Sequence, residues 1–155
     1  FAFSYHQTFG LPVAIIRPFN TYGPRHTYDV IPKFIRLALH HEPITIYGSG
    51  EQARDFTYVD DMIRAFLIMG ERKEAIGQAI NFGTGTAVTV NRIARLIARM
   101  SGSKSKIVHV KKRLAEVERL RCDASKARRM FRWHAQVSIE EGLARNIEWA
   151  RENWL

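Results

Sequence analysis

The sequence predicts an α/β fold with short strands, and three observations support this. Residues 1–9 resemble the last turns of a helix, because Gly10 followed by Pro12 is a usual helix stop. VAIIR at 13–17 is a short β-branched run between prolines, typical of a strand buried on both faces and therefore parallel. Helix-like and strand-like patterns then alternate along the chain. A helix that leads directly into a buried strand is the second half of a β-α-β unit, whose first strand would lie upstream.

The next segments are expected to be a loop, a helix and a strand. Residues 18–29 hold two Pro, one Gly and one Asn, so they predict a loop at the carboxyl end of the first strand, where open α/β sheets bind ligands. Residues 30–41 have helical spacing, with Pro32 tolerated in the first turn. Residues 44–48 alternate as a strand. The expected inner face of the helix is Ile31, Phe34, Ile35, Ala38 and Leu39.

A turn after this strand leads to a second short strand at 55–59. Asp60 then has the residue type of an N-cap. The helix that follows carries one apolar stripe, consisting of Ile63, Phe66, Leu67 and Gly70.

Residues 79–82 (AINF) predict another apolar strand, followed by GTGT. Thr89 can cap the next helix, which ends at Ser101-Gly102. Residues 106–110 predict a strand and 111–121 a basic linker. The apolar positions of the helix after Thr89 are Val90, Ile93, Ala94 and Ile97.

Two helices complete the chain. Asp123 is expected to cap a short helix at 124–131. Ser138 with Glu141 forms a capping box that opens the last helix. Its inward residues are predicted to be Leu143, Ile147 and Trp154.

Composition limits the class of protein. The chain has 155 residues, which is one domain or a piece of a larger protein, and 46% hydrophobic residues are enough for a packed core. The longest apolar run, 11–16, is far shorter than the roughly 20 residues that span a bilayer. Cys122 is the only cysteine, so no internal disulfide can form, which agrees with a reducing cytoplasm. Because the chain opens on Phe1 with no signal-peptide pattern, we expect a soluble, cytoplasmic fragment.

The net charge of +9 is concentrated between Lys104 and Arg132. A basic stripe of this kind could follow a nucleic-acid backbone, neutralise a small anionic ligand, or be a solvated face. Charge alone leaves these three interpretations open.

No catalytic centre or metal site is predicted in this chain. His40 and His41 are adjacent and point to different faces of a helix, and no His pair has the i, i+4 spacing of a helical zinc site. No Gly-x-Ser-x-Gly occurs, and Cys122 has no neighbouring His. The Gly-x-Gly pairs at 48–50 and 83–85 favour turns over ligand loops.

Two polar clusters could bind an anion. RPFNTYGPR at 17–25 places two cations, a carboxamide and two aromatic rings in one loop. EQARDF at 51–56 places Arg54 at the edge of a short strand, where Asp55 could hold its guanidinium in place. The alternative for the first cluster is a turn with a buried Phe, and for the second it is an ordinary surface ion pair.

These clusters belong to an ordered series that resembles a known family. RPFNTYGPR, DVIPKFI, ITIYGSGEQARDFTYVDD, NFGTG, and CDASKARRMFRW with SIEEGLARNIEW resemble the carboxyl-terminal part of the extended short-chain dehydrogenase/reductases. That family contains NAD-dependent sugar-nucleotide epimerases, 4,6-dehydratases and UDP-glucuronate decarboxylases. The resemblance covers essentially the whole chain, and it implies the substrate-binding part of a Rossmann-type enzyme, with a small mixed sheet and helices.

The resemblance implies contacts to both cofactor and substrate. Pro18 and Phe19 match positions that flank the nicotinamide of NAD, and Asn20 matches an Asn near the substrate diphosphate. Asp29 and Val30 match positions that contact the nucleotide.

The base and the diphosphate have their own implied partners. Thr45 to Tyr47 match the strand beside the pyrimidine base, with Tyr47 stacked on it. Arg54 and Arg113 match two arginines that grip the diphosphate, which suits the strong bidentate contacts of guanidinium groups. The implied ligand is a UDP-sugar or a dTDP-sugar.

The chain also departs from the family. Residues 113–116 read Arg-Leu-Ala-Glu where members often have Arg-Pro-Gly-Asp, and Leu120 replaces a common aromatic residue. The Gly-rich fingerprint and the catalytic Tyr-x-x-x-Lys are not in this chain. We therefore expect the fragment to bind NAD weakly or not at all and to be inactive alone.

The resemblance further implies a division of the chain. Residues 1–29 would be the tail of the Rossmann-type domain, and 30–155 mainly the sugar-nucleotide domain, with the 79–82 strand and a helix returning to the Rossmann sheet. The parent protein would be a homodimer through helices mostly missing here. A basic nucleic-acid-binding module and a non-catalytic interaction fragment remain the alternatives, and which sugar nucleotide is bound stays open.

Overall fold

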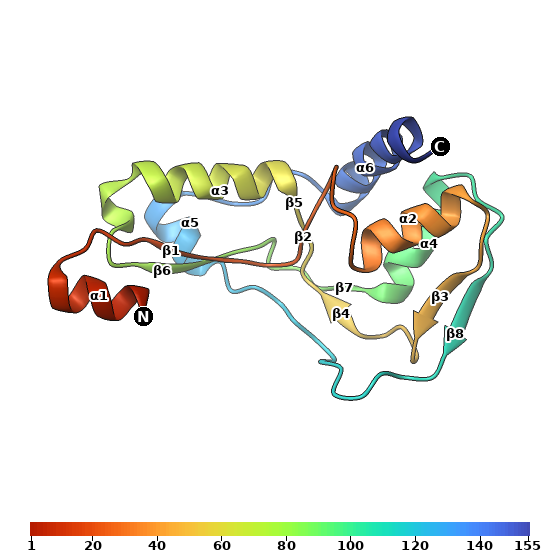
Figure 1. Cartoon of the computed structure of the whole chain (residues 1–155), viewed down its shortest axis with the longest axis horizontal. Helices are drawn as coiled ribbons and strands as arrows, with labels where there is room; N and C mark the ends of the chain where they lie inside the picture. Colours follow the sequence, from red (N-terminus) through yellow and green to blue (C-terminus); the bar gives the residue numbers. More distant parts are fainter.

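The computed structural model describes residues 1–155 as an elongated molecule (Figure 1). Its helices are α1 (Ala2–Phe9), α2 (Val30–Leu39), α3 (Val59–Glu71), the 3-10 turn η1 (Lys73–Ala75), α4 (Val90–Met100), α5 (Ser125–Phe131) and α6 (Ile139–Trp154). Its strands are β1 (Ile15–Pro18), β2 (Thr21–Tyr22), β3 (Ile44–Tyr47), β4 (Ala53–Arg54), β5 (Thr57–Tyr58), β6 (Ala79–Phe82), β7 (Val88–Thr89) and β8 (Ile107–Val110).

The strands form pairs, not one sheet. β1 pairs with β6, β2 with β5 and β3 with β8, all in parallel, whereas β4 and β7 are antiparallel. The α/β class and the parallel pairing of the first strand are therefore confirmed. The small mixed sheet that we expected is divided into four two-stranded pieces.

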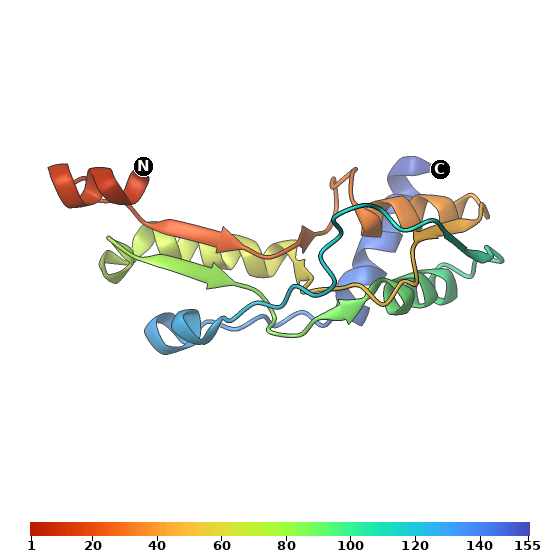
Figure 2. The same ribbon diagram turned by 90° about the horizontal axis from the view of Figure 1, so that it is seen from below.

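Two lobes with separate cores lie at the two ends of the molecule (Figure 2). The β1–β6 lobe contains α1, β1, α3, η1, β6 and α5, and its core is a cluster of 10 buried residues that includes Phe82 and Trp133. The β3–β8 lobe contains α2, β3, α4, β8 and α6, and its core is a cluster of 18 buried residues. The short pairs β2–β5 and β4–β7 connect the lobes.

The helices of the β3–β8 lobe agree with the sequence pattern. All five expected residues of α2 except Leu39 are buried, as are the four expected in α4. The Thr89 hydroxyl caps α4 by accepting from the amide of Arg92, at 3.2 Å, and the Ser138 hydroxyl caps α6 by accepting from the amide of Glu141, at 3.1 Å. These predictions are confirmed because three helices enclose one core.

The β1–β6 lobe contradicts two predictions. No residue of β1 is buried, since β6 is its single strand neighbour. On α3 the predicted stripe faces outward, with Ile63, Phe66 and Leu67 each more than half exposed. The buried residues of α3 are Asp61, Met62, Ala65 and Met69.

The expected cap of α3 is also wrong. The helix begins at Val59, its N-cap is Tyr58, and no side chain caps it. Asp60 lies inside the first turn, and its carboxylate pairs with Arg145 of α6 at 3.2 Å. The predicted strand at 55–59 is correspondingly shorter, because only Thr57 and Tyr58 have strand geometry.

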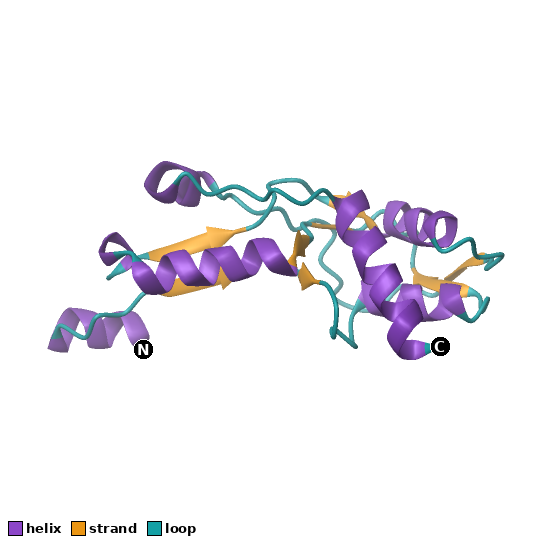
Figure 3. Ribbon diagram, turned by 90° about the horizontal axis from the view of Figure 1, so that it is seen from above, coloured by secondary structure: helices purple, strands orange, loops and turns teal.

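Asp61 explains which face of α3 turns inward. Its buried carboxylate accepts from the backbone amides of Gln136 and Val137, and from Arg64. These bonds fix the segment after α5 against α3 (Figure 3). No helix in the chain has the length and apolar character needed to cross a membrane.

Candidate functional site

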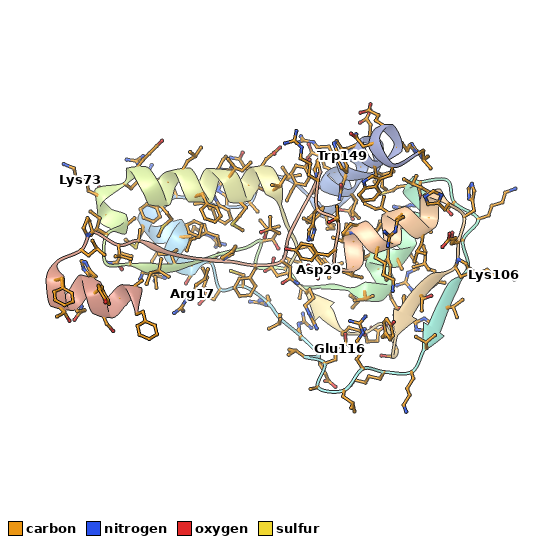
Figure 4. All side chains as sticks on the ribbon, viewed as in Figure 1. Arg17, Asp29, Lys73, Lys106, Glu116 and Trp149 are labelled. Carbon is orange, nitrogen blue, oxygen red and sulfur yellow. The ribbon has the colours of Figure 1, made fainter.

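A cavity of about 680 Å³ opens between the start of α2, strand β3 and the loop after β8. Figure 4 labels Asp29, at the start of α2, and Glu116, in that loop. The cavity is lined by eight of the nine residues that the sequence nominated, namely Pro18, Asn20, Asp29, Val30, Thr45, Tyr47, Arg54 and Arg113. Phe19 is the exception, because its side chain packs against the core of the β1–β6 lobe.

Chain geometry brings these residues together. The loop after β1 crosses from one lobe to the other, and its β2 segment pairs with β5, with Thr21 opposite Thr57. Asp29, immediately before α2, has a φ of 72°, an uncommon backbone conformation for a residue other than glycine. The sharp bend directs the chain into α2 at the edge of the cavity.

Three cations line the cavity, and none of them forms an ion pair with a carboxylate. The Arg54 guanidinium donates only to its neighbouring Ala53 carbonyl, at 2.9 Å. The Arg113 guanidinium lies 4.0 Å from the centroid of the Tyr47 ring, and the Lys33 ammonium lies 5.3 Å from the same centroid. Both distances are within cation–π range. The cavity therefore suits an anion that also carries an aromatic group.

Polar side chains that sequence reasoning missed also line the cavity. The Gln52 amide donates to the Tyr47 carbonyl at 2.8 Å and lies 3.5 Å from Oε1 of Glu116. Oε2 of Glu116 is buried without a hydrogen-bond partner. A period of two along an extended segment puts Gln52 and Arg54 on one side, so the sequence could have indicated Gln52.

His26 is a further missed residue of the cavity. Its ring contacts that of Tyr28 edge-on, with centroids 4.4 Å apart, and its Nε2 lies 3.6 Å from the Asp29 carboxylate. This cluster forms the rim beside the start of α2.

Asp55 does not hold Arg54, which corrects the sequence interpretation. Its carboxylate is fully buried and accepts from Thr84, Gly85 and Cys122. The GTG motif is therefore a turn wrapped around this carboxylate. A side chain at Gly83 would meet Cys122 at 2.5 Å, and Gly85 has a φ of 79°, so both positions favour glycine.

Two titratable groups in or near this region, the Cys122 thiol and the Tyr22 hydroxyl, are held in their protonated forms. Burial, with the nearby carboxylates of Asp55 and Asp123, raises the pKa of the Cys122 thiol to about 12, so little thiolate forms at neutral pH. Burial also raises the pKa of Tyr22, which lines the cavity, and makes its hydroxyl a poor acid or base there. No three His, Cys, Asp or Glu side chains lie together as metal ligands.

Comparison with known proteins places this chain in a family. The family model described as GDP-mannose 4,6 dehydratase matches residues 1–146. A UDP-glucuronate 4-epimerase of Thermodesulfobacterium geofontis is 36% identical over 154 residues, which cover 98% of this chain and 47% of the relative. A UDP-N-acetyl-alpha-D-glucosaminuronate decarboxylase of Bacillus cytotoxicus is 39% identical over 153 residues, covering 92% of this chain and 47% of the relative.

A solved structure extends the likeness to the fold. UDP-glucuronic acid 4-epimerase from Bacillus cereus, in complex with UDP-glucuronic acid and NAD, matches with a TM-score of 0.90 at 32% identity. The match covers 96% of this chain and 48% of that one. The chain thus spans about half the length of the relatives it matches. It belongs to the GDP-mannose 4,6-dehydratase family of extended short-chain dehydrogenase/reductases, as its ordered motifs predicted.

Proposed function

We propose that this chain binds the nucleoside-diphosphate part of a UDP-sugar or dTDP-sugar, as the substrate-binding part of an NAD-dependent epimerase, dehydratase or decarboxylase. The main support is the arrangement of Arg54, Arg113 and Lys33 around one cavity that also presents the Tyr47 ring. A diphosphate is an anion that two guanidinium forks can bind in a fixed orientation. The pyrimidine would stack on Tyr47, and Asn20 would reach toward the diphosphate.

The cofactor fits this chain only in part. NAD supplies hydride transfer when it is bound. Pro18 lines the cavity and could flank a nicotinamide, but the Phe19 side chain packs into the core of its own lobe. Weak or absent NAD binding by this chain alone stays a prediction, which a titration with NAD tests. Sugar orientation, not proton transfer, would be its contribution to catalysis.

Two further predictions concern the longer protein. The homodimer that the family resemblance implies can be tested by the mass of a full-length protein in solution. The cytoplasmic location can be tested by cell fractionation.

The decisive experiment is a calorimetric titration with UDP. We expect one site, and we expect Arg54→Ala to weaken UDP binding by about tenfold or more, because a hydrogen bond to a charged group contributes about 1.5–3 kcal/mol. Arg128→Ala is the matched control, because Arg128 is exposed on α5 and does not line the cavity. Equal affinity of wild type and Arg54→Ala would contradict the proposal.

The same variants distinguish the nucleic-acid alternative. Binding of a single-stranded oligonucleotide that falls steeply with salt, and that Arg128→Ala weakens more than Arg54→Ala, would favour a basic nucleic-acid-binding module. UDP-specific binding that is lost in Arg54→Ala would exclude it as the main function.

A further inference from the structure

We propose that Asp55 is a positioning residue that fixes the backbone on which Arg54 and Arg113 reach the diphosphate. This inference rests on the proposed function. It concerns a carboxylate that lies outside the cavity and contacts neither arginine.

Asp55 joins three segments that are far apart in the sequence. Its Oδ1 accepts from the amide of Thr84 at 2.9 Å and from the hydroxyl of Thr84 at 2.6 Å. Its Oδ2 accepts from the amides of Gly85, at 2.8 Å, and Cys122, at 3.0 Å. Asp55 is 0% exposed, so its carboxylate has lost its contact with water, and these four hydrogen bonds take the place of that hydration.

The first consequence concerns Arg54. Successive side chains in an extended segment point to opposite sides, so an inward Asp55 directs Arg54 outward to the cavity. Because no carboxylate orients the Arg54 guanidinium, its direction depends on the backbone of 53–55. The buried hydrogen bonds of Asp55 therefore fix the direction of the Arg54 side chain, which no ion pair fixes.

The second consequence concerns Arg113, which lies in a segment without helix or strand between β8 and α5. This segment returns to residues 53–55 through three hydrogen bonds, two between backbone groups and one to the Asp55 side chain. The Ala53 amide donates to the Glu118 carbonyl at 2.8 Å, and the Leu120 amide donates to the Ala53 carbonyl at 3.0 Å. The bond from the Cys122 amide to Asp55 is the third. One short strand thus sets the position of both arginines.

The chain contains a matched control in Asp61. This carboxylate is also buried, and it accepts from two backbone amides, those of Gln136 and Val137, and from Arg64, where Asp55 accepts from three amides and a hydroxyl. Asp61 does not line the cavity, and its contacts lie on α3 and the segment after α5. Asp61→Asn should therefore remove a comparable buried anchor without moving the arginines.

The experiment compares UDP with uridine in both variants by NMR titration of the 155-residue chain, with thermal unfolding measured in parallel. The ratio of the uridine Kd to the UDP Kd reports the contribution of the phosphates. In Asp55→Asn we expect the ratio to fall by about tenfold while the uridine Kd changes less than about twofold. In Asp61→Asn we expect a lower Tm and an unchanged ratio.

The inference would be overturned if folded Asp55→Asn had the same ratio of uridine Kd to UDP Kd as wild type. It would also be overturned if the ratio fell as much in Asp61→Asn as in Asp55→Asn. If Asp55→Asn does not fold, Thr84→Val decides, because it removes the hydroxyl bond to Asp55, together with the local bonds of that hydroxyl to Thr86, and keeps the backbone amides that Asp55 accepts from. We expect it to lower the ratio about threefold, and an unchanged ratio would overturn the inference. Failure of the proposed function looks different, since wild type would then bind UDP no more tightly than uridine.

Discussion

The two lobes of this molecule differ in how completely they enclose their apolar residues. In the β3–β8 lobe three amphipathic helices and a strand pair share one core, and the predicted inner residues are buried except Leu39 and Trp154, which are partly buried. In the β1–β6 lobe α1 has no buried residue, and the outer face of α3 carries Ile63, Phe66 and Leu67. The difference teaches that an apolar pattern identifies a face suited to burial, while the neighbouring elements present in the chain decide whether the face is covered.

The largest expected effect is a difference in the free energy of unfolding between the same Leu→Ala substitution made in the two lobes. Leu143→Ala on α6 removes a fully buried side chain and should lower the free energy of unfolding by about 2–5 kcal/mol. Leu67→Ala on α3, where the side chain is 55% exposed, should change it by less than about 1 kcal/mol. Urea unfolding measures both. A cost for Leu67→Ala that equals that of Leu143→Ala would mean that the outer face of α3 is covered in solution.

This contrast also shows what could be predicted from the sequence. The helix after Thr89 has one apolar face, so its orientation follows from its period. Helix α3 has apolar residues on two faces, and its pattern predicted the face of Ile63, which is exposed, and not the face of Met62, which is buried. Which face is buried depends on the hydrogen bonds of Asp61 with Gln136 and Val137. These partners are 75 and 76 positions further along the chain, so no local pattern contains them.

The site could be predicted where its residues lie in contiguous motifs. Arg54 and Tyr47 stand beside turns and strand ends, and Asn20 stands in a loop with distinctive composition. Glu116 was missed as a cavity residue, because its position depends on contacts between the 113–122 segment and residues 53–55.

The next largest effect should distinguish capped from uncapped helices. Ser138→Ala removes the hydroxyl that caps α6 and should cost about 1 kcal/mol. Asp60→Ala should cost less, because Asp60 caps nothing and contributes through the helix dipole and an exposed pair with Arg145. Thermal or urea unfolding measures the loss of stability in each variant. A larger loss for Asp60→Ala than for Ser138→Ala would mean that Asp60 caps α3 after all.

The smallest effect concerns pH and the surface of the β3–β8 lobe. A hydrogen bond from Arg92, at 2.9 Å, lowers the pKa of Glu140 below the ordinary value for a glutamate. A lowered folded-state pKa adds stability above the unfolded pKa, and this contribution is lost as the pH falls through the folded pKa. Glu140→Gln should therefore be slightly less stable than wild type at pH 7 and equal to it in acid. Glu148→Gln, which breaks no ion pair on the same helix, is the control for unfolding curves at both pH values. A difference that persists in acid would contradict the ion-pair explanation.

The Tyr47 ring has a kinetic consequence for any ligand of the cavity. Its face is already covered by the Arg113 guanidinium, at 4.0 Å from the centroid. If a pyrimidine base stacks on that face, as we propose, the guanidinium must first leave, and binding would exchange one planar group for another. A nucleoside alone would displace the arginine and give it nothing to bind. A nucleoside diphosphate would offer the displaced guanidinium a stronger partner, so the exchange itself would discriminate between the two ligands.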